Sequence, residues 1–296
     1  MKGAAVFNQQ QAFGHLSMLM NSPAKRLAGK VTIVTGGARG IGAAIATLFS
    51  QHGAHVIVAD LLEDLGSSLA ETIGGRFIRC DVSMESDVEA AVKLAFRWKG
   101  RLDVMVNNAG IAGPDGSITS LEMCQLKATL DVNLNGVVHG IKYAARAMVE
   151  AGRGGSIICT ASSAALMGGL GSHSYTLSKE AIIGVARSCA CELGVHGIRV
   201  NCVSPHGVPT DILVNAFREL PGREEITAEE VGKVIAERGS LLKGRCGSVA
   251  DAAAAALFLA SDESGFVTGH NLVVDGGFTS GVNTMSYIYH DKTQGD

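Results

Sequence analysis

The sequence predicts a single α/β domain in which seven parallel strands form one sheet and helices cover both of its faces. Short β-branched runs alternate along the chain with longer segments of helical periodicity. Strands such as 56–59 are continuously apolar, which is typical of parallel strands buried on both faces. At 296 residues, with 47% hydrophobic and 18% charged, the chain can bury one large core.

The first half of the chain supplies four strands. Residues 31–35 form a β-branched run that ends at a glycine-rich loop, and a helix over about 41–52 follows with its apolar residues on one face. The same alternation then continues with strands at 55–60, 76–80 and 102–106 and helices at about 62–73 and 85–98.

The second half supplies the other three strands. The pattern predicts helices at about 121–149 and 174–194 and strands at 156–160, 199–203 and 271–274. The segment from Ser204 to about Gly247 breaks this alternation, and we interpret about 206–246 as a substrate lid inserted into the domain. The domain would then span 27–280, between a disordered extension at 1–26 and a tail at 281–296.

Composition excludes several classes of protein. A net charge of −3 argues against a dedicated nucleic-acid binder. The longest apolar run, 252–260, is shorter than the ~20 residues that span a membrane. The seven cysteines show no metal-binding spacing, so we expect no metal and an intracellular, cytoplasmic protein. Residues 1–26 lack the apolar region of a signal peptide, and plastid targeting by them stays open.

The loop after the first strand has a dinucleotide-binding pattern. It reads Thr35-Gly-Gly-Ala-Arg-Gly-Ile-Gly42 and opens directly into a helix, whose amino terminus attracts a pyrophosphate. Such a loop alone could be a turn without a ligand. However, Asp60 ends the next strand 18 residues after Gly42, where an acid binds the adenosine ribose hydroxyls. These residues predict a Rossmann-type cofactor site.

Two residues bear on the choice of cofactor. The carboxylate of Asp60 would repel the 2′-phosphate of NADP, which favours NAD. Arg39, inside the glycine loop, favours the opposite choice because its guanidinium could bind that phosphate. We expect NAD, since the two hydrogen bonds of Asp60 to the ribose are more specific than an arginine that can turn into solvent.

A tyrosine and a lysine lie one helical turn apart at Tyr175 and Lys179. A phenol has a pKa near 10, and bringing it to about 7 requires roughly 4 kcal/mol, which a nearby ammonium and a bound nicotinamide would supply. This pair alone is common on helix surfaces. Ser162, just beyond the strand at 156–160, and Asn133, at a mid-helix position that disfavours asparagine, make a catalytic site more plausible.

Four motifs in this order resemble the short-chain dehydrogenase/reductase family over about 27–280: TGGARGIG (35–42), NNAG (107–110), Ser162 with YTLSK (175–179), and SPHG (204–207). The resemblance implies that Tyr175 is the acid/base and that Lys179 lowers its pKa and holds the nicotinamide ribose. It also implies that Ser162 orients the substrate oxygen and that Asn133 supports a water relay to Lys179.

The resemblance also implies cofactor contacts beyond the glycine loop and Asp60. Asp81 with Val82 would contact the adenine, residues 108–110 would line the central path, and residues 205–210 would receive the nicotinamide carboxamide and phosphates. The expected cofactor set is Gly36, Arg39, Gly40, Ile41, Gly42, Asp60, Asp81, Val82, Asn108, Ala109, Gly110, Tyr175, Lys179, Pro205, Gly207, Val208 and Thr210.

The segments 26–42, 142–148, 192–205 and 269–278 are similar to a plant branch that includes secoisolariciresinol, xanthoxin and borneol dehydrogenases, momilactone synthase and the tasselseed protein. This branch implies reversible oxidation of a secondary alcohol to a ketone on a bulky apolar metabolite, such as a terpenoid, steroid or phenolic alcohol, by a homotetramer. The chain departs from it at Glu180, where we expect histidine, and at His206, where we expect an aromatic or small residue.

The expected substrate pocket combines Ser162 with residues of the lid and its surroundings. His173 is as consistent with a structural role as with a pocket role. The lid helix could pack on the core or close over an apolar substrate, and we favour closure, which would exclude water. The expected pocket residues are Ser162, Met167, His173, His206, Ile212, Leu213 and Phe217.

Two alternatives to an NAD-dependent alcohol dehydrogenase stay open. The first is an NADP-dependent carbonyl reductase, which Arg39 supports. The second is a regulatory protein that binds the cofactor and has only vestigial chemistry. The presence of Ser162, Tyr175 and Lys179 together argues against the second.

Overall fold

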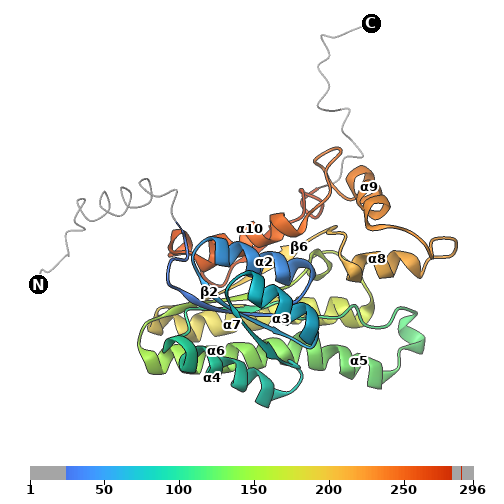
Figure 1. Cartoon of the computed structure of the whole chain (residues 1–296). Helices are drawn as coiled ribbons and strands as arrows, with labels where there is room; N and C mark the ends of the chain where they lie inside the picture. The colour runs from blue at the N-terminus through green and yellow to red at the C-terminus, as the bar shows by residue number, and fades with distance from the viewer. Residues whose placement is uncertain (1–24, 282–287, 289–296) are drawn as a thin grey trace, which may run out of the picture.

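The computed structural model describes residues 25–281 and residue 288, and its centre is a seven-stranded parallel sheet with strand order β3-β2-β1-β4-β5-β6-β7 (Figure 1). The order reverses between β1 and β4, so the carboxyl ends of these two strands flank the crevice where such sheets bind ligands. The strands are β1 (Val31–Thr35), β2 (His55–Asp60), β3 (Arg76–Arg79), β4 (Val104–Asn107), β5 (Gly155–Thr160), β6 (Ile198–Pro205) and β7 (Asn271–Val274).

Helices cover both faces of the sheet, each over its own apolar core. On one face, α2 (Gly40–Gln51), α3 (Glu63–Thr72) and α10 (Val249–Ala260) pack around a cluster that includes Phe49 and Leu257 (Figure 1). On the other face, α4 (Glu85–Lys99), α6 (Gly136–Ala151) and α7 (His173–Leu193) pack around a cluster that includes Met105 and Ile182. The predicted α/β class, the seven parallel strands and the two helical layers are therefore confirmed.

The predicted helix over 121–149 is divided in the structure. It consists of α5 (Met123–Leu130), a π-helical turn (Asp131–Asn135) and α6. A π-helical turn inserts one residue into the helical ladder and often occurs at functional sites. Asn133 lies within this turn, which gives it an orientation that a regular helix would not.

The helix α10 was not predicted, although the chain contains its start pattern. Ser248 and Asp251 form a capping box, in which the Ser248 hydroxyl accepts from the Asp251 amide and the Asp251 carboxylate accepts from the Ser248 amide. The apolar run 252–260 then forms the buried body of the helix. The run is apolar because it belongs to a helix that packs in the core of the domain.

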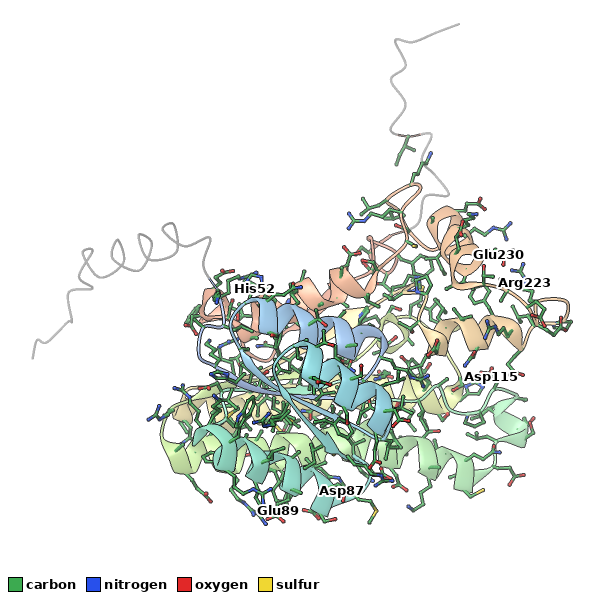
Figure 2. The ribbon with its side chains drawn as sticks, viewed as in Figure 1. His52, Asp87, Glu89, Asp115, Arg223 and Glu230 are labelled. Atoms are coloured by element: carbon green, nitrogen blue, oxygen red, sulfur yellow. The ribbon has the colours of Figure 1, made fainter. Side chains whose placement is uncertain are left out.

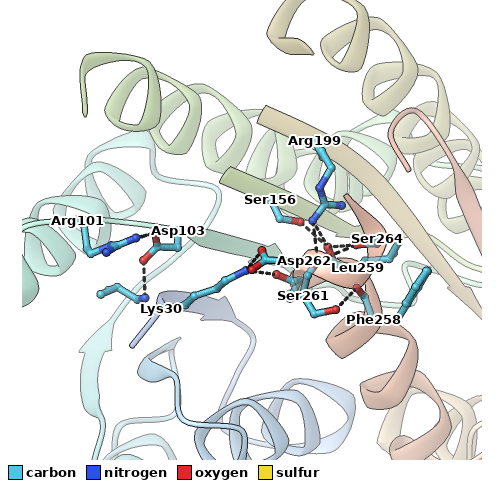
Figure 3. A network of polar contacts seen from close by, with 12 residues as sticks. Lys30, Arg101, Asp103, Ser156, Arg199, Phe258, Leu259, Ser261, Asp262 and Ser264 are labelled. Carbon is cyan, nitrogen blue, oxygen red and sulfur yellow. Dashed lines mark hydrogen bonds and ion pairs between the residues drawn. The ribbon is translucent and has the colours of Figure 1, made fainter. Parts of the chain in front are cut away.

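Polar contacts fasten the amino-terminal edge of the sheet, opposite the crevice (Figure 3). The Arg199 guanidinium donates to the carbonyls of Leu259 and Ser261 and so caps the end of α10. Lys30 pairs with Asp262 at 2.6 Å. These contacts hold the start of β6 and the residue before β1 against the end of α10.

Between β6 and β7 lies the segment that we interpreted as a lid. It contains α8 (Asp211–Arg218) and α9 (Ala228–Arg238) (Figure 1). These two helices share a small apolar cluster of Val214, Ile226 and Val231. Arg223 belongs to the connection between α8 and α9. Figure 2 shows it at the same end of the molecule as Asp115, which belongs to the loop after β4.

The chain ends bear on two of the predictions. Residues 1–24 of the predicted extension and all of the predicted tail except residues 281 and 288 lie outside the described residues, so the structure does not address them. Within the described part, Leu27 is fully buried. None of the helices described there has the length and hydropathy needed to cross a membrane.

Candidate active site

The glycine loop leaves no room for side chains where the backbone packs most closely. A Cβ at Gly36 would lie 2.7 Å from the Cα of Ala109, and one at Gly42 would lie 2.0 Å from the carbonyl oxygen of Gly36. Gly36 and Gly40 also have positive φ angles of 60° and 57°, which favour glycine. The loop thus forms a tight backbone cradle at the amino terminus of α2, which suits a pyrophosphate.

Asn108 holds this loop against the end of β4. Its Nδ2 donates to the carbonyl oxygens of Thr35 and Gly36 at 3.0 and 3.1 Å. The Thr35 hydroxyl accepts in turn from the amides of Asn108 and Ala109 at 3.0 and 3.2 Å. The predicted cofactor residues at 36 and at 108–110 are therefore brought together at the switch point of the sheet.

Asp60 lies beside the same loop at the end of β2. Its Oδ2 accepts from the Ala38 amide at 2.9 Å, and its Oδ1 accepts from the Leu62 amide at 3.0 Å. Each carboxylate oxygen has a further lone pair available, so this geometry fits a group that binds ribose hydroxyls.

Asp81 and Val82 follow β3, near the end expected for the adenine. The Oδ1 of Asp81 accepts from the amide and the hydroxyl of Ser83 at 3.0 and 2.7 Å. Val82 is buried in the core and its carbonyl lies 2.9 Å from Nδ1 of His139. Asp81 thus has a defined orientation, while most of the Val82 side chain serves packing.

Asn133 is fully buried and makes three hydrogen bonds with its side chain. Its Oδ1 accepts from the Ile111 amide at 2.8 Å, and its Nδ2 donates to the Ile111 carbonyl and to the Ser178 hydroxyl at 2.9 and 3.0 Å. It therefore ties the loop after β4 to α7. The side chain has the structural task that its mid-helix position suggested.

Ser162 lies beside the phenol of Tyr175. It is 9% exposed, and its Oγ accepts from the Ala164 amide at 3.1 Å at the start of a 3₁₀ turn. Tyr175 lies in the first turn of α7, where its amide donates to the hydroxyl of the capping residue Ser172. This arrangement places a hydroxyl donor beside a phenol.

Burial raises the pKa of the Tyr175 phenol, and its hydrogen bond with Ser162 acts in the opposite direction. Nζ of Lys179 lies 5.5 Å from the centroid of the Tyr175 ring and donates to the Thr160 carbonyl. That Lys179 lowers the Tyr175 pKa, together with a bound nicotinamide, stays a prediction. Among the groups of the protein, loss of solvation outweighs any stabilisation of the phenolate.

Lys179 is 3% exposed, and its Nζ donates to the Thr160 carbonyl at 2.8 Å. Burial lowers the pKa of Lys179 to about 8. A Cβ at Gly110 would lie 3.5 Å from Nζ and 3.3 Å from the Oδ1 of Asn133. Glycine at 110 therefore keeps the approach to the ammonium open, as a ribose held by Lys179 would require.

The segment after β6 runs past the glycine loop. Gly207 has a φ of 60°, and a Cβ there would meet Ile235 of α9 at 2.4 Å. Val208 is buried, and the Cγ2 of Thr210 lies 3.5 Å from the position of a Cβ at Gly40. Of the predicted contacts at 205–210, Thr210 thus lies against the glycine loop, while Gly207 and Val208 pack within the lid and the core.

His206 lies at a structural junction. Its Nδ1 is 2.8 Å from the Ser163 hydroxyl, and its ring stacks on Phe278 with centroids 4.3 Å apart. Burial lowers its pKa, while Asp275 acts against this. Ser163 and Phe278, neither of which was predicted from the sequence, explain why this position accepts a histidine.

The other predicted pocket residues divide into two groups. Leu213 and Phe217 pack against the apolar cluster shared by α8 and α9, so they stabilise the lid in this structure. Met167 and Ile212 are 37% and 40% exposed, and His173 is also exposed. Glu180 is exposed on α7, so its charge faces away from the buried Lys179.

Several contact residues were missed by the sequence argument. Thr35 and Ser178 lie inside the quoted motifs but were not predicted as site residues. Their hydrogen bonds join segments that are far apart in the sequence, so only the fold reveals them. The acceptor of Lys179 is a backbone carbonyl, which no side-chain pattern indicates. In the part of the chain that is described, no three histidine, cysteine or acidic side chains group as a metal site.

A doubly wound parallel sheet with a glycine cradle and a Ser162, Tyr175 and Lys179 set at its carboxyl edge defines a nicotinamide-dependent oxidoreductase. A family model described as enoyl-(acyl carrier protein) reductase matches residues 36–279. The chain belongs to the short-chain dehydrogenase/reductase family, in the plant branch described above.

Individual relatives agree with this placement. The chain is 64% identical to short-chain dehydrogenase reductase ATA1 of Arabidopsis thaliana, over 90% of this chain and 98% of that protein. It is 48% identical to sex determination protein tasselseed-2 of Zea mays, over 88% and 84% of the two chains. It is 47% identical to (+)-borneol dehydrogenase 2 of Salvia officinalis, over 86% and 91%. The structure of levodione reductase superposes with a TM-score of 0.78 at 29% identity, over 86% of this chain and 100% of that one.

Proposed function

We propose that the protein is an NAD-dependent dehydrogenase that oxidises a secondary alcohol to a ketone, reversibly, on a bulky apolar plant metabolite. The observation that carries the proposal is the grouping of Ser162, Tyr175 and the buried Lys179 at the carboxyl edge of the sheet, beside the glycine cradle. The 47% identity to a borneol dehydrogenase supports a terpenoid alcohol as substrate, and steroid and phenolic alcohols belong to the same proposed class.

Tyr175, as the phenolate, takes the proton of the substrate hydroxyl and becomes the neutral phenol. The Ser162 hydroxyl, whose oxygen already accepts from the Ala164 amide, donates a hydrogen bond to the substrate oxygen and orients it. Lys179 binds the ribose, and Asn133 holds the loop and helix that surround it. A bound oxidised nicotinamide supplies the hydride acceptor and a positive charge beside the phenol.

The choice of NAD rests on Asp60. Its carboxylate is fixed by two backbone amides at the end of β2, where the adenosine ribose would lie. A fixed negative charge accepts hydrogen bonds from ribose hydroxyls and repels a 2′-phosphate. The expected cofactor contacts at 36–42, 81–82, 108–110 and 205–210 stay part of this proposal.

The substrate would enter between the 3₁₀ turn after Ser162 and the lid. Met167 and Ile212 are the exposed apolar side chains of the expected pocket, and both suit an apolar substrate. Leu213 and Phe217 would support the lid from within. We therefore assign the apolar contact to Met167 and Ile212 and the rigidity of the lid to the other two.

We further propose that the protein assembles as a homotetramer. A groove of about 530 Å³ lies between α6 and α7, and its lining includes the apolar side chains of Val138, Ile141, Val149 and Val185. The helices around it offer one face to a second copy of the chain. Light scattering after size-exclusion chromatography tests this, and a monomer would contradict it.

The function is tested by incubating the purified chain with NAD⁺ and a panel of monoterpenoid, sesquiterpenoid, steroid and phenolic alcohols while NADH absorbance is recorded. We expect turnover of at least one secondary alcohol. Turnover with NADP⁺ only would support the carbonyl reductase alternative. Cofactor binding without turnover on the whole panel, in both directions, would support the regulatory alternative.

A further inference from the structure

Arg39 and Asp211 connect the two sides of the cofactor crevice. Arg39 is the residue before α2, and Asp211 is the first residue of α8 in the lid. The Nη1 of Arg39 lies 2.7 Å from the Oδ2 of Asp211, although 172 residues separate them. Beside this pair, Thr210 faces Gly40. Two neighbouring lid residues thus meet two neighbouring residues of the glycine loop.

Arg39 is also close to the ribose-binding carboxylate. The residue before it, Ala38, donates its amide to the Oδ2 of Asp60. A guanidinium on the next residue is within side-chain reach of a phosphate on the ribose 2′-oxygen, and guanidinium is the group that suits this phosphate best. Within the described residues, however, its ion-pair partner is Asp211 and not Asp60.

We propose that Asp211 is a cofactor-selectivity residue, which keeps the Arg39 guanidinium away from the 2′ position and so favours NAD over NADP. This inference rests on the proposed NAD dependence and adds to the role of Asp60. Asp60 excludes the 2′-phosphate directly. Asp211 withholds the only cation of the glycine loop, spanning residues 35–42, that could compensate for that repulsion.

The effect should be moderate in size. The side chains of Arg39 and Asp211 are 60% and 62% exposed, and exposed ion pairs are weak. We therefore expect a change in cofactor preference of about fivefold when Asp211 is neutralised and Arg39 is retained. Because exposed pairs are screened by salt, the change should shrink as ionic strength rises.

The test compares the wild-type chain with Asp211→Asn, with Arg39→Gln and with the double variant. Dissociation constants for NADH and NADPH are measured by calorimetry, and kcat/KM is measured with NAD⁺ and NADP⁺. Glu229→Gln is the matched control, because this substitution also removes one negative charge from the lid. Glu229 is exposed and pairs with Lys233 at 2.8 Å.

We expect Asp211→Asn to tighten NADPH binding about fivefold relative to NADH, and Arg39→Gln in the same chain to abolish this gain. Glu229→Gln should leave the ratio unchanged. An unchanged ratio in Asp211→Asn, an equal gain in Glu229→Gln, or a gain that survives Arg39→Gln would each overturn the proposal. A wild-type preference for NADP⁺ would contradict the proposed NAD dependence, while the shift between wild type and Asp211→Asn would still decide the role of Asp211.

Discussion

The ammonium of Lys179 donates to the backbone carbonyl of Thr160 at 2.8 Å, at the carboxyl end of β5. The sheet itself therefore positions the lysine. Burial of its ammonium costs solvation free energy, which lowers the pKa of Lys179 to about 8. A charged group that the core holds against its preference for water is typical of a site whose geometry serves binding or catalysis.

Replacing Lys179 by methionine should raise stability and abolish activity. The lysine pKa falls from 10.5 to about 8 on folding, so below pH 8 the folded state bears a protonation cost of about 3 kcal/mol. This cost decreases as the pH rises from 8 towards 10.5. The variant also loses the hydrogen bond to the Thr160 carbonyl. We therefore expect Lys179→Met to raise the free energy of unfolding by about 2 kcal/mol at pH 7.

Urea unfolding of both chains from pH 7 to pH 10 measures this effect. The stability of the wild type should approach that of Lys179→Met as the pH rises. A variant that is less stable at pH 7 would show that the ammonium is better solvated than its burial indicates.

Asn133→Ala should destabilise the chain by about 2–3 kcal/mol, because Asn133 is fully buried and its two hydrogen bonds to Ile111 and one to Ser178 would be lost. Activity should also fall, since the loop after β4 would no longer be tied to α7. Thermal unfolding and kcat/KM check the two effects together. Ser178→Ala is the milder comparison, since it removes one of the three Asn133 bonds and the bond from the Ser178 hydroxyl to the Tyr175 carbonyl. Equal losses in both variants would refute the assignment to Ile111.

His206 should make stability sensitive to acid. Its pKa is lowered in the folded state, so as pH falls below 6.5 the unfolded chain binds the proton first and stability decreases. His206→Phe retains an aromatic ring against Phe278 and cannot titrate. The loss of Tm between pH 7 and pH 5 should be smaller in this variant, whereas Ser163→Ala, which keeps the histidine, should retain the acid loss.

Two glycines should respond in opposite ways to alanine. At Gly42 a methyl group would lie 2.0 Å from the Gly36 carbonyl oxygen, so Gly42→Ala should disrupt the cradle and abolish NADH binding. At Gly184, an exposed position within α7, nothing lies within 4 Å, and alanine should stabilise the helix by about 0.5–1 kcal/mol. Calorimetric binding and thermal unfolding distinguish these outcomes, and intact binding in Gly42→Ala would argue against the cradle.

Much of the fold follows from local patterns. The bounds predicted for β1, β2 and β7 agree with those in the structure, because each of these strands contains a run of β-branched or other apolar residues. The helix α10 could not be predicted from hydrophobic periodicity, because its run 252–260 is apolar on every side. Only its capping box marks where the helix begins. The π-helical turn at 131–135 depends on tertiary contacts and has no local pattern.

The candidate site was predictable where it consists of residue types at fixed spacing, and less so where it depends on direction. The positions of Ser162, Tyr175 and Lys179 in the motifs indicated one site, but the direction in which Lys179 donates was not visible. Leu213 and Phe217 have the spacing of an apolar face, and spacing alone does not say whether that face meets a substrate or α9.

The central claim is that Tyr175 is the acid/base of an NAD-dependent oxidation, and Tyr175→Phe tests it most directly. The variant keeps the ring and removes only the hydroxyl. On an alcohol that the wild type oxidises, we expect turnover to be lost while the dissociation constant for NADH stays within about twofold. Turnover at the wild-type rate with intact NADH binding would contradict the account.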